Sequence, residues 1–269
     1  MNSTDQKTIS DFGSQWTTFT ANEGYYGSVS LLQDIFGPLL DVRQVAGKKV
    51  LDIGSGTGRI VNMLLSADAE SVVAVEPSDA FYVLQENLKE YGDRVLPVKN
   101  TGDAIDFHNE FELAVSIGVL HHITEPAPVL KRMVEALIPG GRCLIWLYGK
   151  EGNELYLCIF GLLRLVTTRL PDKALFALAE LMVLAVDLYI FFCRFISFLP
   201  MRSYMLEHLG KLTRENRKLT IIDQLNPAYA KYYSKQEAFG LMSSLGLVNV
   251  RLYHRHGYSW TVIGEKPVN

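Results

Sequence analysis

"LDIGSGTGR" spans Leu51–Arg59 and has glycine at positions 54, 56 and 58. The apolar run "KKVLDI" that precedes this turn predicts a buried strand, and "RIVNMLLSA" after it has the spacing of a helix. Glycines at this spacing allow a tight turn and a close approach of the backbone to a ligand. The stretch therefore predicts a strand, a turn and a helix, with a ligand bound where the strand ends.

Strands and helices alternate on both sides of this turn. Strands are expected at 48–54, 71–76, 94–98, 111–118 and 142–148, with helices at 79–92 and 127–141. Such alternation predicts a parallel sheet with helices on both faces. "LVNVRLYH" and "YSWTVIGEKP" follow a capped helix at 234–246, and only "RHG" separates them, so they predict an antiparallel hairpin. The predicted fold class is α/β, a doubly wound, seven-stranded, mostly parallel sheet with an antiparallel C-terminal hairpin.

A long segment interrupts this pattern after the fifth strand. About 85 residues precede the next helix of the core, whereas links in α/β units usually have about 2–6 residues. This length predicts a helical insertion between strands five and six. The predicted domains are an aromatic-rich N-terminal cap (1–45), a core (46–149 and 232–269) and a mainly helical, hydrophobic insertion (150–231).

The insertion contains a mostly apolar run at 174–199. Lys173, Glu180, Asp187 and Arg194 are spaced seven apart, so on a helix these charges form one narrow stripe. A membrane span is disfavoured, because crossings must come in pairs and the second apolar run, 155–170, reaches only about 24 Å. Two alternatives stay open: a lid that packs on its own neighbours or on a second copy in a homodimer, and a lid that binds an apolar substrate or lies at a membrane surface.

The composition narrows the class of partner. Lys and Arg number 26 and Asp and Glu 29, a net charge of −3, so no nucleic-acid partner is expected. The polar N-terminus lacks a signal pattern, and Cys143, Cys158 and Cys193 form no C-x-x-C motif. We expect buried, reduced cysteines and a cytoplasmic protein, with membrane association left open. Without a carboxylate cluster at ligand spacing, no metal is expected.

Acidic residues follow the predicted strands. Asp52 precedes the glycine turn, where its carboxylate can orient the turn or accept a hydrogen bond from a ligand ammonium group. Glu76 ends the second strand, where a carboxylate can accept both hydroxyls of a ribose. Asp103 follows the third strand, within reach of an adenine amine, and "SIGVLHHI" (116–123) follows the fourth. These positions predict a site for a nucleoside with an amino-acid tail.

"LDIGSGTGR", "AVEPS", "GDAIDF" and "GVLHHITEP" occur in this order at strand ends. Together they resemble class I S-adenosylmethionine-dependent methyltransferases of the small-molecule type, over 47–148 and the final hairpin. The resemblance implies S-adenosyl-L-methionine as cofactor. For the methionine end of the cofactor it implies contacts from Asp52, Gly54, Ser55 and Gly56. It also implies that Glu76 holds the ribose and that Pro77 packs beside the adenine. The adenine edge would be reached by Asp103 and Ala104, and Ile117 would lie near the sulfonium.

The resemblance also implies a cap over the cofactor, formed by the N-terminal segment. Trp16, Tyr25 and Tyr26 are the candidate contacts to cofactor or substrate, and the alternative is that they only pack within the cap. His121 and His122 are the first candidates for a catalytic base, because they follow strand four; the alternative is that they only shape the pocket. His254 and His256 flank the hairpin turn and are expected at the surface.

The predicted function is methyl transfer to a small, apolar or lipid-like acceptor, with O-methylation favoured. One alternative is a catalytically silent adapter that docks on a membrane or partner through helices in 155–209. Another is a nicotinamide-dependent oxidoreductase, but the dinucleotide motif G-x-G-x-x-G would need glycine where Arg59 stands.

Overall fold

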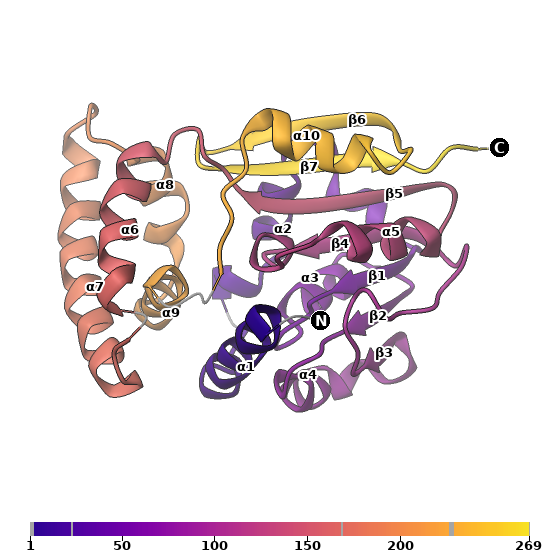
Figure 1. Ribbon diagram of the computed structural model, residues 1–269, viewed down its shortest axis with the longest axis horizontal. Helices are drawn as coiled ribbons and strands as arrows, with labels where there is room; N and C mark the ends of the chain where they lie inside the picture. The colour runs from indigo at the N-terminus through magenta and orange to yellow at the C-terminus, as the bar shows by residue number, and fades with distance from the viewer. Residues whose placement is uncertain (1–2, 23, 168, 226–228, 269) are drawn as a thin grey trace. The chain divides into compact units, whose positions relative to one another are not determined.

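The computed structural model describes residues 3–22, 24–167, 169–225 and 229–268. These residues fall into two compact units. The sheet unit comprises Met1–Asn22, Gly27–Gly152 and Tyr229–Asn269, and the helical unit comprises Glu23–Tyr26 and Asn153–Ala228. Figure 1 traces the chain through both units.

The sheet unit contains a seven-stranded sheet in the order β3-β2-β1-β4-β5-β7-β6. The strands are β1 (Lys49–Ile53), β2 (Ser71–Val75), β3 (Val95–Val98), β4 (Phe111–Ile117), β5 (Leu137–Tyr148), β6 (Val248–Arg255) and β7 (Ser259–Glu265). The first five strands pair in parallel, and β7 pairs antiparallel with both β5 and β6. The predicted fold class is therefore confirmed, including the hairpin.

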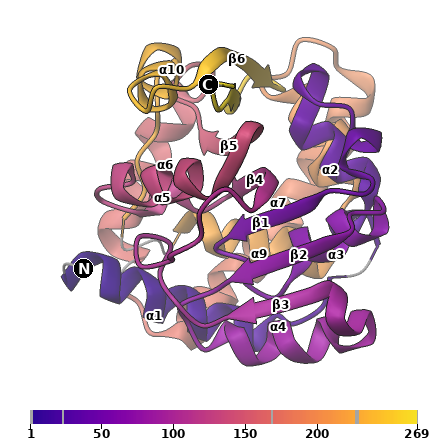
Figure 2. The ribbon, with the colours of Figure 1, turned by 90° about the vertical axis from the view of Figure 1, so that its right-hand side faces the viewer.

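Helices cover both faces of this sheet (Figure 2). They are α1 (Ser3–Thr18), α2 (Val29–Phe36), α3 (Arg59–Ser66), α4 (Ala80–Leu88), α5 (Ala127–Ala136) and α10 (Lys235–Ser243). The α5 and α10 helices lie on one face, and α2 and α3 on the other. The helix predicted to be capped at 234–246 begins with a capping box, which Ser234 and Glu237 form.

The junction between α5 and β5 differs from the predictions. The helix predicted at 127–141 ends at Ala136, because the chain enters β5 at Leu137, opposite Phe111. The register then shifts, so that Leu113 pairs with Arg142, and Gly140 takes a φ of 78°. "PGG" (139–141) therefore lies in the irregular first part of β5 and not in the helix.

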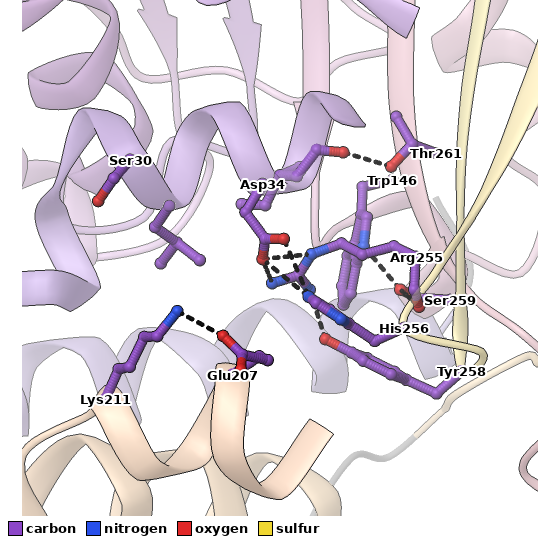
Figure 3. A network of polar contacts seen from close by, with 12 residues as sticks. Ser30, Asp34, Trp146, Glu207, Lys211, Arg255, His256, Tyr258, Ser259 and Thr261 are labelled. Carbon is purple, nitrogen blue, oxygen red and sulfur yellow. Dashed lines mark hydrogen bonds and ion pairs between the residues drawn. The ribbon is translucent and has the colours of Figure 1, made fainter. Parts of the chain in front are cut away.

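The hairpin turn between β6 and β7 is anchored by a buried arginine (Figure 3). His256 and Gly257 both have positive φ, 49° and 75°, which is the backbone of a type I′ turn. Arg255 is only 1% exposed and donates from Nε and Nη2 to Asp34 of α2, at 3.0 and 2.5 Å, and from Nη1 to the Tyr258 hydroxyl. His256 Nε2 lies 2.9 Å from the same carboxylate.

The two hairpin histidines are half-buried, whereas the sequence predicted that they lie at the surface. His256 is held by Asp34, and the ring of His254 stacks on Trp260 with centroids 4.1 Å apart. Position beside a turn does not decide exposure when another element, here α2, packs against that turn.

The helical unit contains α6 (Glu154–Thr167), α7 (Asp172–Phe195), α8 (Arg202–Glu207) and α9 (Arg214–Leu225). A helical insertion between β5 and β6 is consistent with this arrangement. The α7 helix packs on α8 and α9, and α6 also packs on α9. Cys193 of α7 is buried, whereas Cys158 of α6 is exposed, so the expectation that all three cysteines are buried is wrong for Cys158.

Candidate functional site

The turn after β1 is built from three glycines in the left-handed region. Gly54, Gly56 and Gly58 have φ angles of 77°, 54° and 86°, which other residues rarely adopt. A Cβ on Gly54 would lie 2.4 Å from Val119 Cγ2, and one on Gly58 2.7 Å from Leu88 Cδ1. Gly54 and Gly58 thus also allow close packing, whereas Gly56 is needed for its backbone conformation.

The same turn is tied to the end of β2. The N–H groups of Gly54 and Ser55 donate to the Val75 carbonyl at 2.8 and 3.0 Å. The Ser55 hydroxyl donates to the Asp52 carbonyl at 3.2 Å. Because β1 and β2 are parallel neighbours, the side chains that follow them meet at one edge of the sheet.

Glu76 lies at this edge and links the turn to the start of α4. The Gly56 N–H donates to Glu76 Oε2 at 2.9 Å, while Ser78 donates to Oε1 from its N–H at 2.9 Å and from its hydroxyl at 2.5 Å. A carboxylate has about four acceptor positions, so a ligand diol would use the remaining one and share or displace a donor. Glu76 is only 6% exposed, and its charge is held in place by these three bonds.

Asp52 is the second buried carboxylate of the site. Its Oδ2 has no hydrogen-bond partner among the described residues. Burial raises the pKa of Asp52 to about 7, and the nearby charge of Glu76 adds to this, while Ser55 and Arg59 act in the opposite direction. An unpartnered buried carboxylate is costly, so this oxygen is suited to a cationic or hydrogen-donating ligand group.

The α1 helix runs along the ends of the strands and packs beside α4 (Figure 1). Asp5 accepts two hydrogen bonds from Thr124, after β4, at 3.0 and 3.1 Å. Gly13 packs against Ser78, whose Cβ would lie 3.0 Å from a Cβ on Gly13. The indole of Trp16 lies over Gly56, with Nε1 3.8 Å from the position of a Cβ there. The structure thus brings Trp16 to the glycine turn.

The other predicted cofactor and cap residues are placed as follows. Pro77 is half-buried after Glu76, and Ile117 is buried at the end of β4. Asp103 and Ala104 are exposed between β3 and β4, where the Ala104 N–H donates to the Thr101 carbonyl. Tyr25 and Tyr26 belong to the helical unit, where the Lys211 ammonium lies over the Tyr25 ring. The ligand contacts of these residues stay predictions.

His121 and His122 lie in an aromatic cluster after β4. His121 is fully buried, its ring centroid is 3.8 Å from that of Tyr148, and neither ring nitrogen has a hydrogen-bond partner among the described residues. Burial, and then the charge of His122, lower the pKa of His121 well below its usual value, so this ring is neutral at physiological pH. His122 donates from Nδ1 to the Tyr229 carbonyl at 2.7 Å, which fixes its tautomer. A catalytic role for either histidine stays a prediction.

Several residues near the site were not selected from the sequence. Ser78 is one of them, and it supplies two of the three bonds to Glu76. Asn22 binds Thr57 through both its amide atoms, which ties the segment after α1 to the glycine turn. Tyr232 stacks on Tyr148 at 5.2 Å. For Asn22 and Tyr232 the partner lies 35 or more positions away in the sequence, so no local pattern indicates the contact.

Comparison with known proteins is consistent with this site. Residues 51–143 match the model of a family described as "Methyltransferase domain". The tRNA U34 carboxymethyltransferase of Stutzerimonas stutzeri is 32% identical over 128 residues, which are 44% of this chain and 37% of that protein. The protein of the same name from Dichelobacter nodosus is 30% identical over 103 residues, 38% of this chain and 33% of that protein. The chain thus spans only about a third of the length of these relatives.

Solved structures share the fold over nearly the whole chain. A SAM-dependent methyltransferase of Aquifex aeolicus aligns over 94% of this chain and 97% of its own, with a TM-score of 0.52 and 14% identity. The magnesium protoporphyrin IX methyltransferase of Synechocystis, solved with bound SAH, aligns over 99% and 88%, with a TM-score of 0.50 and 15% identity. At these identities the likeness concerns the fold.

Proposed function

We propose, from the premise that the chain carries a methyltransferase domain of the class I S-adenosylmethionine-dependent family, that it transfers a methyl group from this cofactor to a small, apolar or lipid-like acceptor. The observation that carries the proposal is the pair of buried carboxylates, Asp52 and Glu76, on either side of the Gly54–Gly58 turn. The turn itself supplies backbone amides and allows a ligand to approach the backbone closely.

The residues present fit the cofactor. The unpartnered Oδ2 of Asp52 suits the ammonium group of the methionine end, and Glu76 suits the ribose diol. Trp16, above Gly56, adds an apolar surface that excludes water. When bound, the cofactor supplies a methyl group already activated on a sulfonium, so the protein has to position the acceptor and, for an oxygen acceptor, remove its proton.

An apolar acceptor and O-methylation are supported by the residues around β4 and β5. An aromatic cluster lies at and after the ends of these strands and consists of His121, Trp146, Tyr148 and Tyr232. The ring of His121 is neutral, so one of its nitrogens carries a lone pair that can accept a hydrogen bond. The acceptor side of the site thus combines apolar contact with one imidazole lone pair.

Binding of S-adenosylhomocysteine is the direct test. The parent protein is expected to bind it in isothermal titration, and Gly56→Asp to lose about 100-fold or more in affinity, because the new carboxylate meets Trp16 and Glu76 in a strained left-handed backbone. Gly240→Asp is the matched control, since Gly240 of α10 is exposed with open space around it. If the parent does not bind, or Gly56→Asp binds as the parent does, the proposal is wrong.

The affinity for S-adenosylhomocysteine is also expected to depend on pH through Asp52. Below its pKa of about 7 this group is neutral, and above it the carboxylate attracts the ligand ammonium. Affinity should therefore rise with pH between about 5.5 and 7.5, by up to about tenfold per unit below the pKa. Asp52→Asn should bind weakly with a flat profile, whereas Asp106→Asn, at an exposed carboxylate, should keep the parental profile. A parental profile in Asp52→Asn would refute this role.

A nucleic-acid acceptor is the second candidate, because the relatives described above are tRNA U34 carboxymethyltransferases. The net charge of −3 gives no general attraction to tRNA. Radiolabelled cofactor incubated separately with total tRNA and with a lipid extract would distinguish the two acceptors. Label in the lipid fraction alone supports our proposal, and label in the tRNA alone would replace it with the second candidate.

A further inference from the structure

The α7 helix presents large apolar side chains to solvent. Its exposed residues include Leu181, Leu184, Leu188, Phe191, Phe192 and Phe195, followed by Phe198 beyond the helix end. The alternating spacing of three and four places most of them on one face. Phe195 is 73% and Phe198 85% exposed. We call this set the outward face of α7; among the described residues, this helix is also the one long and apolar enough to cross a bilayer.

The two acids of the charged stripe of α7, Glu180 and Asp187, lie beside this face and pair with α9. Glu180 accepts from Arg214 of α9 at 2.6 Å and pairs with Lys218 at 2.9 Å. Asp187 pairs with Arg217, which is also on α9. Both acids are thus neutralised by cations within the helical unit. The apolar outward face therefore lies beside these ion pairs and opposite the buried positions of α7, which include Ala179, Val183 and Ile190.

Positive charge remains around the outward face. The other two members of the stripe, Lys173 and Arg194, are exposed and lie near the two ends of α7. Residues 153–228 contain nine Lys and Arg against seven Asp and Glu, a surplus of two positive charges in a chain whose net charge is −3. A surface that combines exposed Leu and Phe with flanking cations is complementary to anionic lipid headgroups above an apolar interior.

We propose that the outward face of α7 docks on the surface of an anionic lipid bilayer, with the helix in the plane of the headgroups. The two cations then contact lipid phosphates and the phenyl rings enter the upper acyl region. This docking does not depend on the proposed methyl transfer, although it would bring the enzyme to a lipid-like acceptor.

Two other occupants fit the structure less well. A spanning α7 would need a second crossing to return the chain to the sheet, and the 14 residues of α6 reach only about 21 Å of a core about 30 Å thick. A second copy packed antiparallel against α7 would bring Lys173 of one helix beside Arg194 of the other, which is repulsive.

Vesicle flotation of the full chain tests the proposal. We expect the protein to float with vesicles of phosphatidylcholine containing phosphatidylserine, and much less with phosphatidylcholine alone. Phe195→Ser and Phe198→Ser are each expected to reduce partitioning by about tenfold. Arg194→Gln should reduce it by about fivefold on the anionic vesicles only. Phe239→Ser, at an exposed phenylalanine of α10, is the matched control and should bind as the parent does.

Three outcomes would overturn the proposal. One is absence of binding to either vesicle, or binding of Phe195→Ser and Phe198→Ser that equals that of the parent protein. A second is a dimer in light scattering that Phe195→Ser dissociates, which would assign the face to a second copy. The third is resistance to alkaline carbonate extraction, which would indicate a span. S-adenosylhomocysteine titration of the same variants separates this test from that of the proposed function, because all of them should retain binding.

Discussion

Replacing Glu76 with alanine is expected to lower the affinity for S-adenosylhomocysteine by about 100-fold or more. Hydrogen bonds to a charged group contribute about 1.5–3 kcal/mol each, and a ribose diol would donate two of them. The substitution also leaves the Gly56 and Ser78 N–H groups without their acceptor. The turn and the start of α4 would then lose their common anchor, so the loss should exceed that from removing ligand contacts alone.

Glu76→Gln tests whether charge or shape is responsible. Glutamine keeps the volume of the side chain but presents an N–H₂ group to one set of donors, so we expect an affinity between those of the parent and of Glu76→Ala. Glu86→Ala, an exposed carboxylate on α4, is the matched control and should bind as the parent does. Thermal denaturation of each variant separates loss of binding from loss of folding. Unchanged titration curves for Glu76→Ala would exclude a ribose contact.

The sheet was predictable because its signals are local. Valine-rich runs such as Ser71–Val75 read as buried strands, and the short "RHG" link permits only an antiparallel pair. Once the strands are parallel and adjacent, Asp52 and Glu76 must meet at one edge, so this part of the site follows from topology. The same reasoning placed Ile117 at the end of β4.

The contacts within the site were less predictable because they join distant segments. Nothing near Trp16 in the sequence indicates that its ring lies over Gly56. The spacing of Glu180 and Asp187 predicts a stripe but not that α9 neutralises it. The end of α5 at Ala136 was also missed, because strand pairing with β4 outweighed the turn-forming tendency of "PGG".

The ion pair of Arg255 with Asp34 also joins distant segments, and its loss should have a large effect on stability. Asp34→Ala is expected to reduce the free energy of unfolding by about 3–5 kcal/mol, because it leaves the guanidinium buried without its counter-charge. For a chain of this size the melting temperature should fall by about 10 °C. Asp106→Ala is the matched control: Asp106 also lies near an arginine, Arg132, at 3.9 Å, but its side chain is exposed, so no measurable shift is expected.

The same pair predicts how stability responds to acid. Burial raises the pKa of Asp34, but the hydrogen bond from His256 and the charge of Arg255 outweigh it and lower the pKa to about 2. The unfolded carboxyl group takes up its proton near its ordinary value of 3.8, so the stabilisation is complete above that pH and is lost as pH falls towards about 2. Urea denaturation of the parent and of Asp34→Ala across this range should therefore give curves that converge at low pH. A difference in stability that stays constant down to pH about 2 would show that Asp34 contributes through packing and not through its charge.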